Sequence, residues 1–241
     1  MTRGASNGST AGGRFTRFVV ETVLLVVVAV TVAALLRMFV VQAFVVPSGS
    51  MLPTIERTDR IVVSKLSEAD RGDVVVFEDP GGWLPQGDRP VGRSGPLGRA
   101  LEFVGVLPPS DTGYLVKRLV GLPGDHVACC DDRGRVTVNG EPLNESYLPR
   151  GTDPSLQRFD VVVPRGRVWV MGDNRSNSGD SRPHLDDGTA FVPARNVVGP
   201  AFAIVWPLAD IDGLDAPPTF RDVPDPDRPA PQRPVVRRSP G

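Results

Sequence analysis

The chain has 241 residues, 40% of them hydrophobic, which is enough for one sizeable folded unit. Its formal net charge of −1 lacks the positive excess of nucleic-acid-binding proteins, so we expect no nucleic-acid partner. The two cysteines and two histidines match no zinc-site spacing, so a metal site is poorly supported. Cys129 and Cys130 are adjacent, which favours two small apolar residues over a strained bond between neighbours.

The N-terminal region divides into a polar and an apolar segment. Residues 1–17 are rich in Gly, Ser and Thr, which is typical of a disordered segment. Residues 18–36 are strongly apolar and approach the roughly 20 residues that cross a bilayer as a helix. Ala33 and Ala34 would also fit a cleavable signal peptide, and a buried core helix is a third, weaker interpretation. Because apolar character continues past Leu36, we favour a permanent transmembrane helix.

Basic residues beside the apolar segment predict its orientation. Arg3, Arg14 and Arg17 lie at or before its start, and basic residues tend to remain on the cytoplasmic side of a membrane. We therefore expect a single-pass protein of the cell membrane, in contact with lipid. Its N-terminus would be cytoplasmic and its remainder extracytoplasmic.

Residues 37–208 have the pattern of a mainly β domain. Valine-rich runs alternate with turn residues, and β-branched side chains favour strands. Asn139-Gly140 is a strong hairpin signal. Strand character is predicted at 37–46, 60–66, 73–78, 114–120, 126–129, 135–138, 158–163, 167–171 and 198–206.

Two segments depart from this β pattern. Residues 79–113 are rich in Gly, Pro and Arg and are predicted to form a surface insertion. Within it, Leu101–Leu107 is a short apolar run that could be helical or could touch lipid. Residues 209–241 are predicted to form a disordered tail, because 217–241 holds eight prolines and little apolar content.

A serine on a constrained turn, Ser50, follows the apolar segment closely. Serine is a weak nucleophile at neutral pH and needs a neighbouring base. Lysine occurs only at Lys65 and Lys117 among 27 basic residues, and a desolvated lysine can lose its proton whereas arginine cannot. Alone, Ser50 could be a turn residue and Lys117 a surface charge. Together they are a candidate nucleophile and base.

Four motifs follow the apolar segment in order. They are PSGSMLPT at 47–54, RGDVV at 71–75, KRLVGLPGD at 117–125 and GDNRSNSGDSR at 172–182. This ordered set resembles the motifs of the bacterial type I signal peptidases, membrane-bound serine proteases that remove signal peptides from exported proteins. The resemblance covers roughly residues 37–206, and Ser176 stands where many members carry aspartate.

The resemblance implies roles for individual residues. Ser50 would be the nucleophile and Lys117 the general base, in agreement with the apolar residues beside the lysine. The Ser50 N–H and the Ser48 hydroxyl would form the oxyanion hole, and Ser178 would hydrogen-bond the lysine and orient it. Charges that would pair to hold the last motif against the site are Arg118, Asp173, Arg175, Asp180 and Arg182, with Arg118 as the partner of Asp173.

A Ser-His-Asp triad is the competing catalytic arrangement. His184 could complete it with Asp180 or Asp186. The position of Lys117 within its motif makes the triad the poorer interpretation.

The implied fold is mainly β, with an antiparallel catalytic core, a smaller β cap around residues 121–164 and one N-terminal transmembrane helix. The implied activity is cleavage of exported preproteins after small residues, close to the protein-export machinery and without a metal or organic cofactor. Shallow apolar pockets would select the substrate, and Phe44, Val46 and Val76 could line them.

Two other functions remain open. A catalytically inactive, membrane-anchored binding or assembly protein of the same fold is expected to lack Ser50 or Lys117, and both are present. A self-cleaving repressor-type Ser/Lys peptidase would need an N-terminal DNA-binding region, where this chain has its apolar segment.

Overall fold

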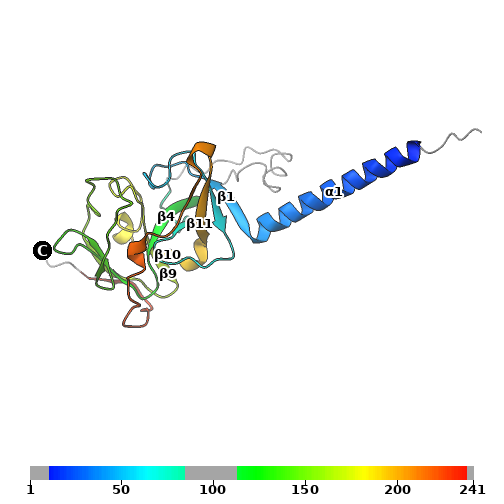
Figure 1. Ribbon diagram of the computed structural model, residues 1–241. Helices are drawn as coiled ribbons and strands as arrows, with labels where there is room; N and C mark the ends of the chain where they lie inside the picture. The colour runs from blue at the N-terminus through cyan, green and yellow to red at the C-terminus, as the bar shows by residue number, and fades with distance from the viewer. Residues whose placement is uncertain (1–10, 85–112, 238–241) are drawn as a thin grey trace, which may run out of the picture.

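The computed structural model describes residues 11–84 and 113–237. The surface insertion expected at 79–113 lies mostly outside the described residues, as do residues 1–10 and the apolar run Leu101–Leu107. Figure 1 shows one long helix projecting from a domain built of β-sheets.

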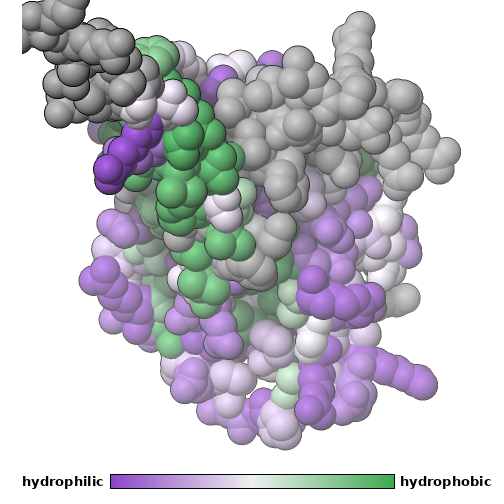
Figure 2. Space-filling view, turned by 90° about the vertical axis from the view of Figure 1, so that its right-hand side faces the viewer, coloured by the Kyte–Doolittle hydropathy of each residue, from purple (hydrophilic) through white to green (hydrophobic). Residues whose placement is uncertain are grey.

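The helix α1 runs from Ala11 to Phe39, so it extends beyond both ends of the segment expected at 18–36. Within it, Phe15–Leu35 is apolar and long enough to cross a membrane, and none of this span is buried. In Figure 2, which views the molecule from the side where the helix projects, a green apolar band runs down the view with purple side chains beside and below it. Valine favours strands, yet this valine-rich segment is helical. A helix satisfies its backbone groups internally, as surroundings of hydrocarbon demand.

The first sheet contains the strands that carry the serine turn and the lysine. Its eight antiparallel strands have the order β1-β2-β11-β3-β4-β9-β10, with β12 paired to β11. Because β4 lies between β3 and β9, both of its edges are hydrogen-bonded and its register is fixed. The strands are β1 Val41–Val45, β2 Arg60–Ser64, β3 Val74–Glu78, β4 Tyr114–Gly121, β9 Arg167–Met171, β10 Val192–Pro193, β11 Val197–Trp206 and β12 Asp212–Gly213.

The second sheet is smaller and has the order β13-β8-β5-β6-β7. Asn139 and Gly140 both have positive φ, 53° and 85°, and form the tight turn between β6 and β7. Cys129 and Cys130 are joined as a disulfide, which differs from the expectation of two separate side chains. The strands are β5 His126–Cys129, β6 Val136–Val138, β7 Glu141–Pro142, β8 Phe159–Val162 and β13 Val235–Val236.

The predicted fold class, a mainly β and antiparallel protein with one N-terminal apolar helix, is confirmed. Alternating apolar residues of the strands form the buried clusters. One of them contains Met51 and Ile55 of the serine turn together with Ile61 of β2. Short 3-10 helices occupy the connections at Pro183–Leu185 (η1), Ala194–Asn196 (η2), Leu208–Asp210 (η3) and Pro218–Phe220 (η4).

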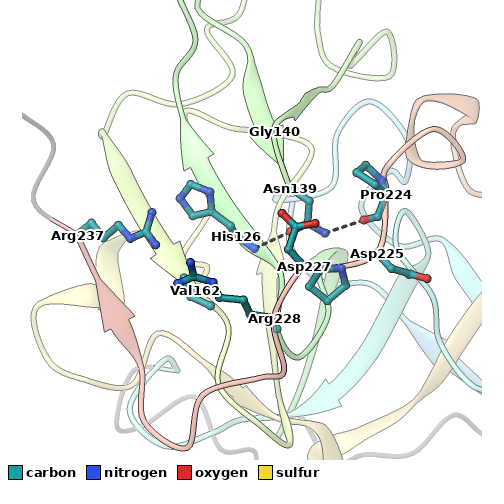
Figure 3. Close-up of a pocket in the computed structure, with 11 residues that line it drawn as sticks. His126, Asn139, Gly140, Val162, Pro224, Asp225, Asp227, Arg228 and Arg237 are labelled. Atoms are coloured by element: carbon teal, nitrogen blue, oxygen red, sulfur yellow. Dashed lines mark hydrogen bonds between the residues drawn. The ribbon is translucent and has the colours of Figure 1, made fainter.

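The C-terminal segment packs against the domain as far as Arg237, which corrects the prediction of a disordered tail over 209–241. Phe220 is buried, and β13 pairs with β8. Figure 3 shows the segment crossing the second sheet, where the Asn139 amide donates to Pro224 O at 2.8 Å beside a cavity of about 420 Å³. The proline-rich composition hid this packing, because a few apolar residues rather than the prolines supply it.

Candidate active site

The serine turn connects β1 to β2 and is anchored from beneath by apolar side chains. Met51 and Ile55 are fully buried, and the Ile55 N–H donates to Met51 O at 3.1 Å. Ser50 is 7% exposed, so bulk water has little access to it. The turn is therefore a rigid support for this hydroxyl.

Lys117 lies on the central strand β4 and is 2% exposed. Its Nζ donates to Ser50 Oγ at 2.6 Å and to Val116 O at 3.1 Å. Burial lowers the pKa of Lys117 from 10.5 to about 8, although the carboxylates of Asp180 and Asp173 act in the opposite direction. A lysine in this position can exchange a proton with the serine hydroxyl near neutral pH.

Two hydrogen-bond donors stand beside the serine oxygen. Ser48 Oγ lies 3.2 Å from Ser50 Oγ. Within residues 11–84 and 113–237, the Ser50 N–H donates to no acceptor. Both groups are therefore available to a carbonyl oxygen that approaches the serine.

The loop 172–182, which follows β9, holds the serine turn from behind. The Asn174 N–H donates to Ser50 O at 3.0 Å, and the Asn174 amide donates to Gly49 O at 2.9 Å. At Gly172 a Cβ atom would lie 2.5 Å from Ser50 O, so only glycine fits there. The sequence did not single out Asn174 or Gly172, although both belong to the fourth motif.

Buried ion pairs fix this loop. The Arg118 Nε donates to Asp173 Oδ1 at 2.8 Å, and the Thr54 hydroxyl donates to Asp173 Oδ2 at 2.6 Å. The Arg182 Nε donates to Asp180 Oδ1 at 2.9 Å. Burial alone would raise the pKa of Asp180, but the hydrogen bonds and charge of Arg182 outweigh it and hold this pKa below its usual value.

Ser178 departs from its expected contact. Its Oγ atom is buried, yet it forms no hydrogen bond within the described part of the chain, so the expected bond to Lys117 is not formed. Its neighbour across the loop is Gly172. The structure thus brings together Ser48, Ser50, Lys117, Arg118, Asp173, Asp180 and Arg182, and places Ser178 beside them without that bond.

Comparison with known proteins identifies the family. A family model described as signal peptidase, peptidase S26, matches residues 19–206, which include all four motifs. The chain belongs to the signal peptidase S26 family. Signal peptidase I of Mycobacterium tuberculosis H37Rv is 40% identical over 215 residues, covering 78% of this chain and 72% of that protein. A probable signal peptidase I of Mycobacterium leprae is 37% identical over 230 residues, covering 80% and 78%.

As a member of this family, the chain is a signal peptidase, a hydrolase that removes signal peptides. A crystal structure of a signal peptidase I from Enterococcus faecalis V583 is 24% identical, with a TM-score of 0.36. It covers 56% of this chain and 97% of that one.

His184 of this signal peptidase is engaged away from the serine. Its ring stacks on Trp83 with centroids 4.6 Å apart, and its Nδ1 lies 2.8 Å from Asp187 Oδ2. The hydrogen bond with His184 lowers the pKa of Asp187 to about 2. No hydrogen bond within residues 11–84 and 113–237 joins His184 to Ser50, so these residues do not assemble the alternative triad.

A hollow lies beside Ser48 of this signal peptidase. Its volume is about 440 Å³, and apolar side chains of β1, β3 and β4 form most of its wall. Phe44, Val46 and Val76, which the sequence suggested as pocket residues, all line it. Among the described residues, no group of three His, Cys, Asp or Glu side chains is arranged to hold a metal ion.

Proposed function

We propose that the chain is a serine endopeptidase that removes N-terminal signal peptides from exported preproteins at the membrane surface, with Ser50 as nucleophile and Lys117 as general base. The observation that carries this proposal is the 2.6 Å contact between Lys117 Nζ and Ser50 Oγ. Burial lowers the pKa of this lysine to about 8, so a useful fraction is neutral near physiological pH.

Each chemical step uses a group already in reach. Neutral Lys117 takes the proton of the Ser50 hydroxyl as Oγ attacks the scissile carbonyl carbon. The resulting oxyanion accepts hydrogen bonds from the Ser50 N–H and the Ser48 hydroxyl. Protonated Lys117 then gives its proton to the departing amine, which leaves an ester between Ser50 and the signal peptide. Water, deprotonated by the same lysine, hydrolyses this ester and restores the serine.

The hollow beside Ser48 supports the substrate assignment. Its wall is largely apolar and includes Phe44 and Tyr114, which pack edge to face against each other with ring centroids 5.1 Å apart. Side chains preceding the scissile bond would enter this space, and its apolar wall favours uncharged ones. Preproteins with small apolar residues at the first and third positions before the bond, as the family resemblance implies, are compatible with such a wall.

The membrane-surface location rests on the helix and on exposed apolar residues. The chain passes from α1 almost directly into β1 and the serine turn. Trp206, Leu208 and Ile211 are also exposed, at the end of β11 and just beyond it. A span flanked by arginines on its N-terminal side favours a cytoplasmic N-terminus, with the β domain outside and close to the export machinery.

Cleavage of a model preprotein by the detergent-solubilised protein tests the proposal. Ser50→Ala removes one hydroxyl oxygen from a well-anchored turn, so we expect complete loss of cleavage with unchanged folding. Ser67→Ala removes an exposed serine from another loop and serves as the matched control. Near-normal turnover by folded Ser50→Ala would remove this serine from the mechanism. Binding of preprotein without cleavage by the unmodified protein would favour the inactive binding protein.

A further inference from the structure

Glu145 and Tyr147, which lie between β7 and β8, reach the loop 172–182. The Glu145 side chain is 3% exposed, and it pairs with both terminal nitrogens of Arg175, whose side chain is fully buried. Arg175 in turn donates from Nε to Gly172 O at 3.0 Å. Arg175 directly follows Asn174, whose N–H binds the serine turn. The Glu145 carboxylate therefore holds the neighbour of a residue that supports Ser50.

Tyr147 links this carboxylate to the strand of the lysine. Its hydroxyl donates to Glu145 Oε1 at 2.8 Å, and its ring lies 4.3 Å from the guanidinium carbon of Arg118. Burial raises the pKa of Tyr147 well above its usual value, so the hydroxyl remains a donor. Arg118 immediately follows Lys117 and is itself paired with Asp173. Together, Glu145 and Tyr147 thus contact the loop 172–182, which supports Ser50, and strand β4, which carries Lys117.

The C-terminal segment packs against Tyr147. The Phe220 ring stacks on Tyr147 at 6.4 Å between centroids. It also packs so closely on Gly72 that a Cβ atom there would lie 2.7 Å from the ring. Gly72 O accepts a hydrogen bond from Arg118 Nη1 at 2.6 Å, so the contact returns to the same arginine.

We propose that Glu145 and Tyr147 are positioning residues, which hold Arg175 and Arg118 so that the loop 172–182 seals Lys117 from water and supports the Ser50 turn. This inference rests on the proposed Ser50–Lys117 dyad. Neither residue belongs to the four motifs, and both come from the segment between β7 and β8.

The physical reason is the charge of Arg175. A guanidinium buried without its carboxylate is costly, and the loop can relieve this cost by moving toward water. The charges that act on Lys117 are those of Asp180, Asp173 and Arg182, and all three belong to that loop. Opening the loop would hydrate the lysine and return its pKa toward the ordinary value.

The direction of the pH effect separates movement from simple electrostatics. If the loop opens, the acidic limb of the rate profile moves to higher pH, because a hydrated lysine holds its proton more tightly. If only the negative charge of Glu145 is lost, without movement, the lysine is less readily protonated and the limb moves to lower pH. The two causes therefore predict opposite shifts.

Glu145→Gln in the full-length, detergent-solubilised protein is the test. We expect a fall in kcat of about 10-fold to 100-fold, as misplacement of catalytic groups produces, with KM little changed. The acidic limb should move upward, and hydrogen exchange at 172–182 should accelerate. Glu141→Gln removes the same charge from β7, where the carboxylate has no ion pair within the described residues, and should behave as the unmodified protein.

Tyr147→Phe keeps the ring over Arg118 and removes only the hydroxyl. Like Glu145→Gln it should lower kcat, but only by roughly 2-fold to 10-fold, because a single hydrogen bond is lost. If Glu145→Gln does not fold, Tyr147→Phe tests the proposed positioning role in its place.

Several outcomes would overturn the inference. One is a folded Glu145→Gln protein with normal kcat and an unmoved acidic limb. Another is a limb shifted to lower pH, and a third is reduced stability with normal turnover by each folded molecule. Measuring exchange at 172–182 also in a Ser50→Ala background keeps this test independent of whether the dyad assignment holds.

Discussion

Lys117 differs from the buried arginines around it in the partner it has. Each arginine faces a carboxylate, Arg118 with Asp173, Arg175 with Glu145 and Arg182 with Asp180. Within the described residues, Lys117 hydrogen-bonds no carboxylate; its side chain meets a hydroxyl and a backbone carbonyl. The three arginines, which stay charged, are each paired with a carboxylate. Lys117, whose proposed role requires a neutral side chain, has no such direct pair.

Replacing this lysine distinguishes a base from a mere positive charge. Lys117→Arg should be as inactive as Lys117→Ala, because arginine keeps its proton at any usable pH. In the unmodified enzyme, kcat/KM should fall as the pH drops below about 8, since the lysine with its lowered pKa then takes up a proton. A pH series with a model preprotein measures this limb. An active Lys117→Arg enzyme together with an inactive His184→Ala enzyme would contradict the assignment.

At the scale of residues, sequence reasoning found the groups that carry recognisable chemistry. Ser50 and Lys117 stand in motifs and are brought within hydrogen-bonding distance. Glu145 and Tyr147 had no such signal, because an acidic residue and a tyrosine in a turn-rich segment are ordinary there. Only the tertiary contact with Arg175 and Arg118 gives them meaning.

Among the elements, the C-terminal segment differs most from its sequence-based expectation. It crosses the second sheet, adds β13 to β8 and buries Phe220 and Val223. The family model ends at residue 206, so this packing lies beyond the matched region. The segment joins the second sheet to the core around Gly72 and Tyr147.

Truncating Phe220 should therefore destabilise the protein. Phe220→Ala should lower the free energy of unfolding by about 3 kcal/mol, at the lower end for buried aromatic residues, because the segment is at the surface. Denaturant unfolding of the detergent-solubilised protein measures the change. Leu156→Ala, at a site 72% exposed, is the control and should have little effect. Equal stabilities of the two variants would show that the segment is not held by this ring.

The strands were predictable where composition and burial agree. Short runs of valine and other apolar residues bounded by turn residues predicted β3, β5, β8 and β9 nearly in place, because such side chains suit a pleated, buried surface. The start of β1 was misplaced. Residues 37–39 belong to the helix. The sequence could not show this, because nothing in that apolar run marks where the helix ends and the strand begins.

For the whole molecule, the exposed helix and the β domain imply two different surroundings. The apolar span is uncovered by the protein, whereas the domain has its own buried clusters. A bilayer would cover the former and water the latter.

Protease added to intact spheroplasts tests the proposed orientation. With the N-terminus in the cytoplasm, the protease should digest the β domain and leave a small protected fragment that contains α1. Detergent lysis before digestion is the control and should abolish that protection. Full protection of the β domain would reverse the orientation, and a mature chain beginning within the apolar span would show that the span is a cleaved signal.

The long sequence separations between the residues of the proposed dyad and its supports imply that the chain is inactive while it is being made. Ser50 meets Lys117 across 67 residues, and Gly49 meets the Asn174 amide across 125. Ser50 therefore leaves the ribosome well before Lys117 and the loop 172–182 have been made. Such non-local contacts also form late in folding. With the proposed dyad, the nascent chain carries an unactivated hydroxyl, and it can act as a protease only after β4 and the loop 172–182 have packed against the serine turn.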